Sequence, residues 1–205
     1  LEGQLKTLEK DLLTSSQDLS QKRHELALIL EREIKQELTD LYMEKADFQV
    51  KFSKSKFNHE GNEQVEFYIS INPGEGFKPL VKVASGGELS RLMLAIKSAF
   101  ARKEDKTSIV FDEVDTGVSG RVAQAIAQKI HKIGSHGQVL AISHLPQVIA
   151  AADYQFFIEK ESKDDSTVST VRLLTKEERV EEIAKMLAGD QVTQAALSQA
   201  KELLK

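Results

Sequence analysis

The first 46 residues carry a pattern that restricts them to one long helix. They contain no proline and a single glycine, and their apolar residues form a regular series: Leu5, Leu8, Leu12, Leu19, Leu26 and Ile29, then, after a shift of one position, Leu30, Ile34 and Leu41. Such periodicity with one discontinuity is typical of a coiled coil. We therefore expect residues 1–46 to be a coiled-coil arm about 65–70 Å long, paired with an antiparallel helix from another part of a longer protein. Packing on the chain's own globular part is an alternative that suits residues 30–41 better than residues 1–26.

Residues 47–205 have the composition of a mixed α/β domain. The strands predicted from apolar alternation and short apolar runs are 48–52, 65–71, 80–83, 109–111, 139–142, 154–158 and 167–174. The predicted helices run from the glycines at 86–87 to residue 101 and over 122–133, 146–152, 176–187 and 191–204. The first two strands and the last two read as hairpins. The strands between them alternate with helices, which predicts a parallel sheet with functional residues at the carboxyl ends of its strands.

Residues 84–91, Ala-Ser-Gly-Gly-Glu-Leu-Ser-Arg, form a glycine turn that leads directly into a helix. Gly86 and Gly87 let backbone N–H groups approach a ligand closely, and the N-terminus of a helix favours an anion. A Ser-Gly-Gly sequence before a helix is also often only a capped turn. Taken alone, this turn is consistent with both interpretations.

Two apolar segments end in polar side chains that can support chemistry. Residues 108–111 lead into Asp112 and Glu113, and residues 139–143 lead into His144. An aspartate at a strand end can hold Mg²⁺, and the carboxylate after it can orient and deprotonate water. The alternatives are two solvated loop carboxylates and a surface histidine. The order of the two segments favours the functional interpretation, and the other four histidines, which lack such context, are expected to be structural or exposed.

These segments, in this order, resemble the ATP-binding-cassette ATPases. Residues 84–91 and 111–120 are similar to the SMC-like branch of that family, whose heads sit on long coiled coils. The resemblance covers roughly residue 47 to the end of the chain, with residues 1–46 as the arm. It implies an α/β fold, the C-terminal lobe of an ABC/SMC-type P-loop ATPase head, and a function in bacterial DNA double-strand-break repair and recombination.

The resemblance also implies roles for single residues and partners for the chain. Asp112 would bind Mg²⁺, Glu113 would be the catalytic base, and His144 would contact the γ-phosphate of ATP. The ATP-binding residues implied by the signature motif and the D-loop are Ser85, Gly86, Gly87, Glu88 and Asp115. Two heads would sandwich ATP in a homodimer, in the bacterial cytoplasm and on the nucleoid, with DNA as a partner of the full-length protein and no membrane involved.

One motif of the family is missing. None of the eleven glycines is followed by lysine, so there is no Gly-x-x-x-x-Gly-Lys-Ser/Thr loop to cradle the α- and β-phosphates. We therefore expect this chain to require the N-terminal lobe of the same protein, and alone neither to bind ATP tightly nor to hydrolyse it. The alternatives are an ATPase lobe of another branch, such as a different SMC-like protein or a transporter, and a non-catalytic coiled-coil module. The coiled coil disfavours a transporter, and the polar strand ends disfavour a purely structural module.

Charge and composition further limit the binding partners and the kinds of site that the chain can have. The net charge of −4 gives no overall electrostatic basis for binding nucleic acid. Any DNA contact would need a local patch, for which Lys51, Lys54 and Lys56 are candidates, although lysines on a strand more often protect a sheet edge. The absence of cysteine excludes disulfides and thiolate metal sites. No apolar run approaches the roughly 20 residues of a membrane-spanning helix.

Overall fold

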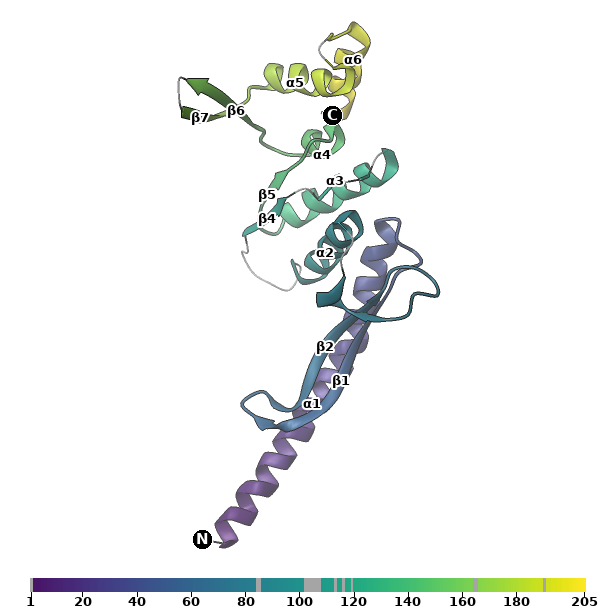
Figure 1. The fold of residues 1–205 in the computed structure, drawn as a ribbon, viewed down its shortest axis with the longest axis vertical. Coiled ribbons are helices and arrows are strands. Elements are labelled where there is room, and N and C mark those ends of the chain that lie inside the picture. The colour runs from purple at the N-terminus through teal and green to yellow at the C-terminus, as the bar shows by residue number, and fades with distance from the viewer. Residues whose placement is uncertain are drawn as a thin grey trace. The chain divides into compact units, whose positions relative to one another are not determined.

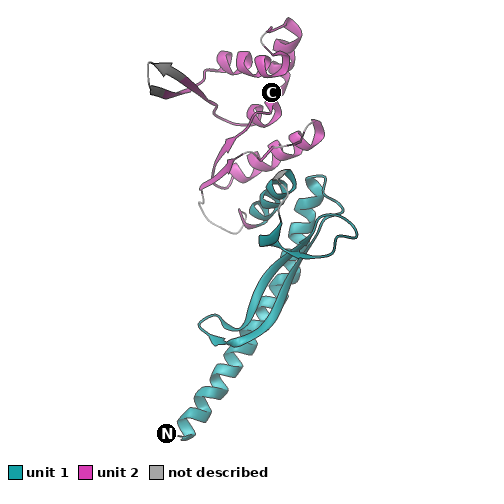
Figure 2. Cartoon of the chain, viewed as in Figure 1, with its two compact units in different colours: residues 1–99 teal, residues 100–205 magenta. Residues whose placement is uncertain are grey.

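The computed structural model describes residues 2–83, 86–101, 108–112, 114–115, 117–118, 120–163, 166–189 and 191–205, and Figure 1 shows the order of their helices and strands. The chain divides into two compact units, residues 1–99 and 100–205 (Figure 2). No helix in the described part of the chain is long and apolar enough to cross a membrane. The expected boundary between arm and head at residue 46 stays a prediction.

The first unit begins with α1 (Glu2–Asp40), the single long helix that the leucine spacing predicts. It ends before the predicted limit because Tyr42 adopts a left-handed conformation with φ of 61°. The amides of Tyr42 and Met43 donate to the carbonyls of Thr39 (3.0 Å) and Leu38 (2.9 Å). These two bonds form a Schellman motif, which usually has glycine at its left-handed position. With tyrosine there instead, the sequence carries no signal for the end of the helix.

A hairpin follows α1, as predicted. β1 (Asp47–Asn58) pairs antiparallel with β2 (Gly61–Ser70), so that the first residue of β1 lies opposite the last residue of β2. The predicted hairpin is confirmed, and its strands extend further toward the turn than the alternating apolar residues indicated. The polar residues near the turn continue the ladder of backbone hydrogen bonds, which needs no apolar side chains.

The prediction of a strand at residues 80–83 is wrong. Only β3 (Lys78–Pro79) pairs with β2, and η1 (Leu80–Lys82) is a turn of 3₁₀ helix. The Val83 amide donates to the Leu80 carbonyl at 3.2 Å and closes this turn. Since Pro79 has no N–H group, it cannot donate to a continuing sheet ladder.

The hairpin lies along α1 (Figure 1), and a polar face of the helix makes many of the contacts. Ser16 and Ser20 donate from their hydroxyls to two side chains of β2, at 2.6 and 2.9 Å. The ring of His24 stacks on that of Phe52, with centroids 3.8 Å apart. Glu31 accepts a hydrogen bond from a backbone amide of β1 at 2.8 Å. The sequence did not indicate this polar face, because only the apolar series was periodic.

The leucine series of α1 divides into an exposed and a buried part. The exposed residues are Leu5, Leu8, Leu12, Leu19, Leu26 and Ile29. Beyond them Ile34, Leu38 and Leu41 are completely buried. Packing on the chain's own globular part, the alternative that suited residues 30–41, is therefore confirmed for Ile34 and Leu41.

The second unit contains the predicted parallel strand pair. β4 (Ser108–Asp112) pairs parallel with β5 (Gln138–Ile142) along the full length of both strands, and α3 (Gly120–Gly134) connects them. The apolar face of α3 is buried, and α3 packs on β5. A helix that connects two neighbouring parallel strands brings their carboxyl ends to the same edge. The predicted α/β organisation is confirmed in this unit.

The rest of the second unit is helical around one hairpin. α4 (Pro146–Ala150) is shorter than predicted, and α5 (Lys176–Ala188) and α6 (Gln194–Leu203) pack on it and on each other. β6 (Phe156–Lys163) and β7 (Ser166–Leu173) form the predicted hairpin, with strands that extend into the segment expected to be a loop. The small core of the helical group comprises Ile183, Ala184, Ala196 and Ala200.

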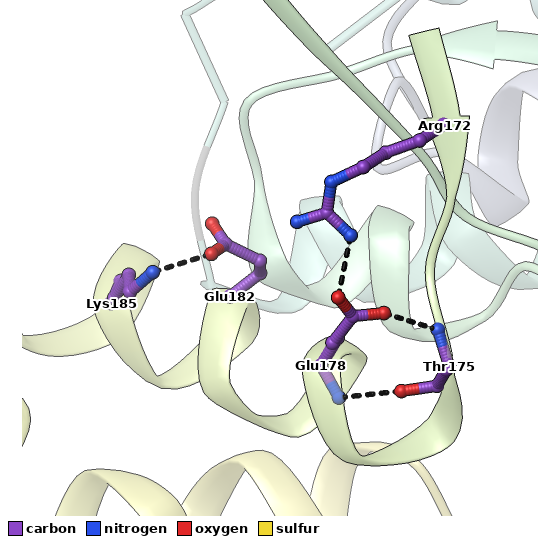
Figure 3. Close-up of polar contacts among 5 residues, drawn as sticks. All are labelled: Arg172, Thr175, Glu178, Glu182 and Lys185. Atoms are coloured by element: carbon purple, nitrogen blue, oxygen red, sulfur yellow. Dashed lines mark hydrogen bonds and ion pairs between the residues drawn. The ribbon is translucent and has the colours of Figure 1, made fainter.

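A network of polar contacts fixes the start of α5 (Figure 3). Thr175 Oγ1 accepts from the Glu178 amide at 3.2 Å, and Glu178 Oε2 accepts from the Thr175 amide at 2.8 Å, which is a capping box. Arg172 donates to the other carboxylate oxygen of Glu178, and Lys185 pairs with Glu182. The hydrogen bond from the Thr175 amide, followed by the one from Arg172, lowers the pKa of Glu178 below its ordinary value.

Candidate active site

The parallel strand pair brings two of the predicted site segments to one edge of the sheet. Asp112, the last residue of β4, lies opposite Ile142, the last residue of β5. The Asp112 side chain is exposed. His144 follows Ile142 by two residues, so the carboxylate and the imidazole both come from the carboxyl ends of neighbouring strands. In open α/β sheets, this edge is where ligands bind.

Asp115 connects the turn after β4 with the end of β5. Its side chain is 0% exposed. Its Oδ2 atom accepts a hydrogen bond from the Ser143 hydroxyl and further bonds from the amides of His144 (3.2 Å) and Leu145 (3.3 Å). The Ser143 hydroxyl oxygen in turn accepts from the Leu145 amide at 3.1 Å. One carboxylate thus gathers three successive residues of the segment between β5 and α4.

The second oxygen of Asp115 faces the histidine. Oδ1 is buried and has no hydrogen bond from any described residue. It lies 3.6 Å from His144 Nδ1, which is beyond ordinary hydrogen-bond distance but close enough for an ion pair. The His144 side chain is 70% exposed. One edge of the imidazole therefore faces a buried carboxylate while most of the ring stays accessible.

The predicted signature segment lies in the first unit. Gly86 begins α2 (Gly86–Ala101), and Gly87 and Glu88 are half-buried in its first turn. The helix thus starts where the sequence predicted, with the free amides of its first turn. Ser85 and the predicted catalytic base Glu113 lie outside the described residues.

Sequence reasoning missed Ser143. It precedes the predicted His144 and donates from its hydroxyl to Asp115. A serine at the end of an otherwise apolar strand is a weak signal, and its partner lies 28 residues away in the sequence. The sequence also gave no sign that Lys51, one of the three candidate lysines, has an aromatic partner: its Nζ lies 4.1 Å from the centroid of the Tyr68 ring.

The polar residues at the sheet edge could bind one cation if a bound ligand supplied further oxygen atoms to it. Among the described residues there is no group of three or more His, Cys, Asp or Glu side chains that could hold a metal ion by themselves. Mg²⁺ does not need such a group, because it is commonly bound by one or two carboxylates together with substrate phosphates and water. The exposed Asp112 carboxylate fits that mode of binding.

Comparisons with known proteins first define the class of fold. No family model matches the chain. An SMC head domain with a coiled coil and joint from Pyrococcus yayanosii superposes with a TM-score of 0.58 at 20% identity, over 80% of this chain and 30% of that one. An SMC head domain from Pyrococcus furiosus, with an extended coiled coil and bound to the C-terminal domain of ScpA, gives 0.54 at 19% identity, over 81% of this chain and 39% of that one. The fold is similar to that of part of an SMC head domain with its coiled coil.

Sequence similarity then relates the chain to particular proteins. The chain is 51% identical over 209 residues to DNA repair protein RecN of Halalkalibacterium halodurans and 49% identical over 221 residues to DNA repair protein RecN of Bacillus subtilis. Both matches cover 100% of this chain but only 37% and 38% of the relatives. The chain is therefore similar along its whole length to RecN proteins and spans little more than a third of their length.

Proposed function

We propose that this chain is the C-terminal lobe of a RecN-like ATPase head that acts in DNA double-strand-break repair and recombination in the bacterial cytoplasm. The observation that carries the proposal is the sheet edge where Asp112 and the Asp115–His144 pair meet, in a chain similar along its whole length to RecN proteins. ATP-driven dimerisation of two heads would regulate how the full-length protein holds DNA. The lobe alone would be inactive, because the phosphate-binding loop would come from the N-terminal lobe.

The proposed cofactors are ATP and Mg²⁺. When bound, ATP supplies the phosphoanhydride bond that is hydrolysed, and Mg²⁺ neutralises charge on its phosphates. Asp112 would hold the cation, for which an exposed strand-end carboxylate is suited. Glu113 would orient the attacking water and accept its proton, and His144 would contact the γ-phosphate with its exposed ring.

The residues near the start of α2 would act on the partner head. Ser85, Gly86, Gly87 and Glu88 would contribute the free amides and polar side chains of a helix N-terminus to the γ-phosphate of ATP held mainly by the opposite protomer. Asp115 would belong to the D-loop, which would lie at the interface between the two heads. What supports this arrangement is the fold of an SMC head together with the similarity to RecN.

The proposal is tested by measuring ATP turnover after this chain is mixed with the matching N-terminal lobe. We expect turnover only in the mixture, and a loss of at least about a hundredfold with Glu113→Gln, since a positioned general base contributes about 10² to 10⁴. Glu159→Gln is a matched control, because Glu159 is an exposed carboxylate on β6. A folded mixture without turnover, or equal losses in the two variants, would contradict the catalytic assignment and favour a non-catalytic coiled-coil module.

A further inference from the structure

The buried carboxylate of Asp115 has two oxygens with different surroundings. Oδ2 accepts three hydrogen bonds from the segment of residues 143–145. Oδ1 is equally buried and accepts none from the described residues. An ionised carboxylate can only accept hydrogen bonds, and a buried acceptor without a donor destabilises the fold. A donor near Oδ1 is therefore strongly favoured.

The imidazole of His144 is a group that could serve as that donor. Its Nδ1 atom lies 3.6 Å from Asp115 Oδ1. A proton on Nδ1 would give the buried oxygen a hydrogen-bond donor after a small closure, whereas a lone pair on Nδ1 would face the negative oxygen and repel it. In a neutral imidazole one nitrogen carries the proton and the other accepts, and the partner of one nitrogen sets which tautomer forms.

We infer that Asp115 is a positioning residue that fixes the backbone of His144 and keeps the proton of its imidazole on Nδ1. With Nδ1 protonated in both the neutral and the charged ring, Nε2 is the nitrogen whose protonation changes. Nε2 then accepts a proton or, once protonated, donates to an anionic oxygen. The use of this nitrogen on a phosphate rests on the proposed function, but the tautomer itself does not.

A purely structural role for Asp115 predicts a different result. If the carboxylate only satisfied Ser143 and the two backbone amides, the ring would be free to adopt either tautomer. The two roles are therefore distinguished by the state of the imidazole and not by the stability of the fold.

The test is ¹⁵N NMR of the imidazole nitrogens in this 205-residue chain at about pH 8, where an ordinary histidine is neutral. A His144→Gln sample identifies the signals of His144 among those of the five histidines. We expect the ¹⁵N shifts to report a proton on Nδ1 and a bare Nε2. Protonated Nε2 in the unaltered chain would overturn the inference, and this measurement needs no variant of Asp115.

Two substitutions distinguish the effect of the Asp115 carboxylate on the tautomer from the effect of the groups around it. Asp115→Asn keeps one oxygen for the three donors and turns an amide N–H toward Nδ1, so it should shift the proton of His144 to Nε2. Ser143→Ala removes one donor but leaves the carboxylate beside the ring, so the tautomer should not change. An Asp115→Asn chain that is folded, by its backbone amide spectrum, and keeps the Nδ1 proton would contradict the inference.

Turnover in the mixture with the N-terminal lobe then shows whether the tautomer matters for activity. Asp115→Asn should reduce kcat roughly tenfold to a hundredfold, by analogy with groups that orient metal-binding histidines, with little change in KM. If Glu113→Gln has no effect on turnover, the proposed function fails while the NMR result for His144 stands. If Glu113→Gln abolishes turnover and Asp115→Asn leaves it unchanged, the orienting role in catalysis is refuted.

Discussion

Replacing Thr175 with alanine removes the side-chain half of the capping box at the start of α5. The lost contact is the 3.2 Å bond from the Glu178 amide to Thr175 Oγ1, while the 2.8 Å bond from the Thr175 amide to the Glu178 carboxylate involves the backbone and can persist. Loss of a threonine cap costs about 1 kcal/mol. That is a factor of about five in the opening equilibrium of α5.

Amide hydrogen exchange of α5, followed by mass spectrometry, measures this change directly. Thr175→Ala should speed the exchange of the α5 amides by about fivefold. Thr175→Ser keeps a hydroxyl acceptor and is the matched control, so its exchange should stay near that of the unaltered chain. The same acceleration in both variants would refute the reasoning, because the hydroxyl would then contribute nothing.

The same cap makes the stability of α5 depend on pH. The pKa of Glu178 is lowered in the folded chain, first by the hydrogen bond from the Thr175 amide and then by Arg172. Its contribution is therefore present above the ordinary glutamate pKa of about 4.5 and is lost as the pH falls through the lower folded value. Glu178→Gln should exchange faster than the unaltered chain at pH 7 and converge with it in acid. A difference that is independent of pH would show that the charge of Glu178 is irrelevant.

Three further tests, two of them with a control substitution, address burial, backbone conformation and capping. Ile34→Ala should lower the free energy of unfolding, measured in urea, by about 2–5 kcal/mol because the side chain is completely buried. Leu8→Ala is the control at a 65% exposed position and should change it by less than about 0.5 kcal/mol. Equal effects of the two substitutions would contradict the packing of α1. Gly189→Ala should destabilise by about 1–3 kcal/mol, because its φ of 74° with ψ of −153° is a conformation that essentially only glycine adopts. Gly134→Ala, with open space around the added Cβ and no positive φ, should be neutral or stabilising by thermal unfolding; equal losses in both would show that the positive φ is not the cause. Arg179→Met should cost about 1–3 kcal/mol, because the guanidinium donates to one carbonyl in the last turn of α4 and to two in the segment that follows it; an unchanged melting temperature would show that these bonds are dispensable.

Much of the fold could be predicted because its elements carry local signals. Apolar alternation identified both hairpins, and the short apolar runs identified β4 and β5 with α3 between them. The predicted bounds and strands were wrong where the backbone of a single residue decided where an element ends. Tyr42 adopts a conformation that sequence rules reserve for glycine, and Pro79 stops a strand that its apolar neighbours suggested.

The candidate site was predictable in its residue types but not in its contacts. Apolar strands that end in Asp112 and His144 indicated the edge where the two meet. The sequence could not show that Asp115 is buried against Ser143 and His144, because α3 and β5 separate these residues along the chain. Resemblance to a family implied a role for Asp115 toward ATP, whereas the geometry adds a role toward the histidine.

The contacts between α1 and the hairpin have a mechanical consequence for the arm. From Ser16 onward, α1 is held to β1 and β2 by side-chain contacts. Bending this part of the helix would break the hydrogen bonds of Ser16 and Ser20 and the stack of His24 on Phe52 at the same time. The turns before Ser16, about 20 Å of helix, have only the stiffness of a single helix. Under a load at the N-terminal end of α1, bending should therefore occur in the turns before Ser16, while the part of α1 that contacts β1 and β2 moves with these strands as one unit.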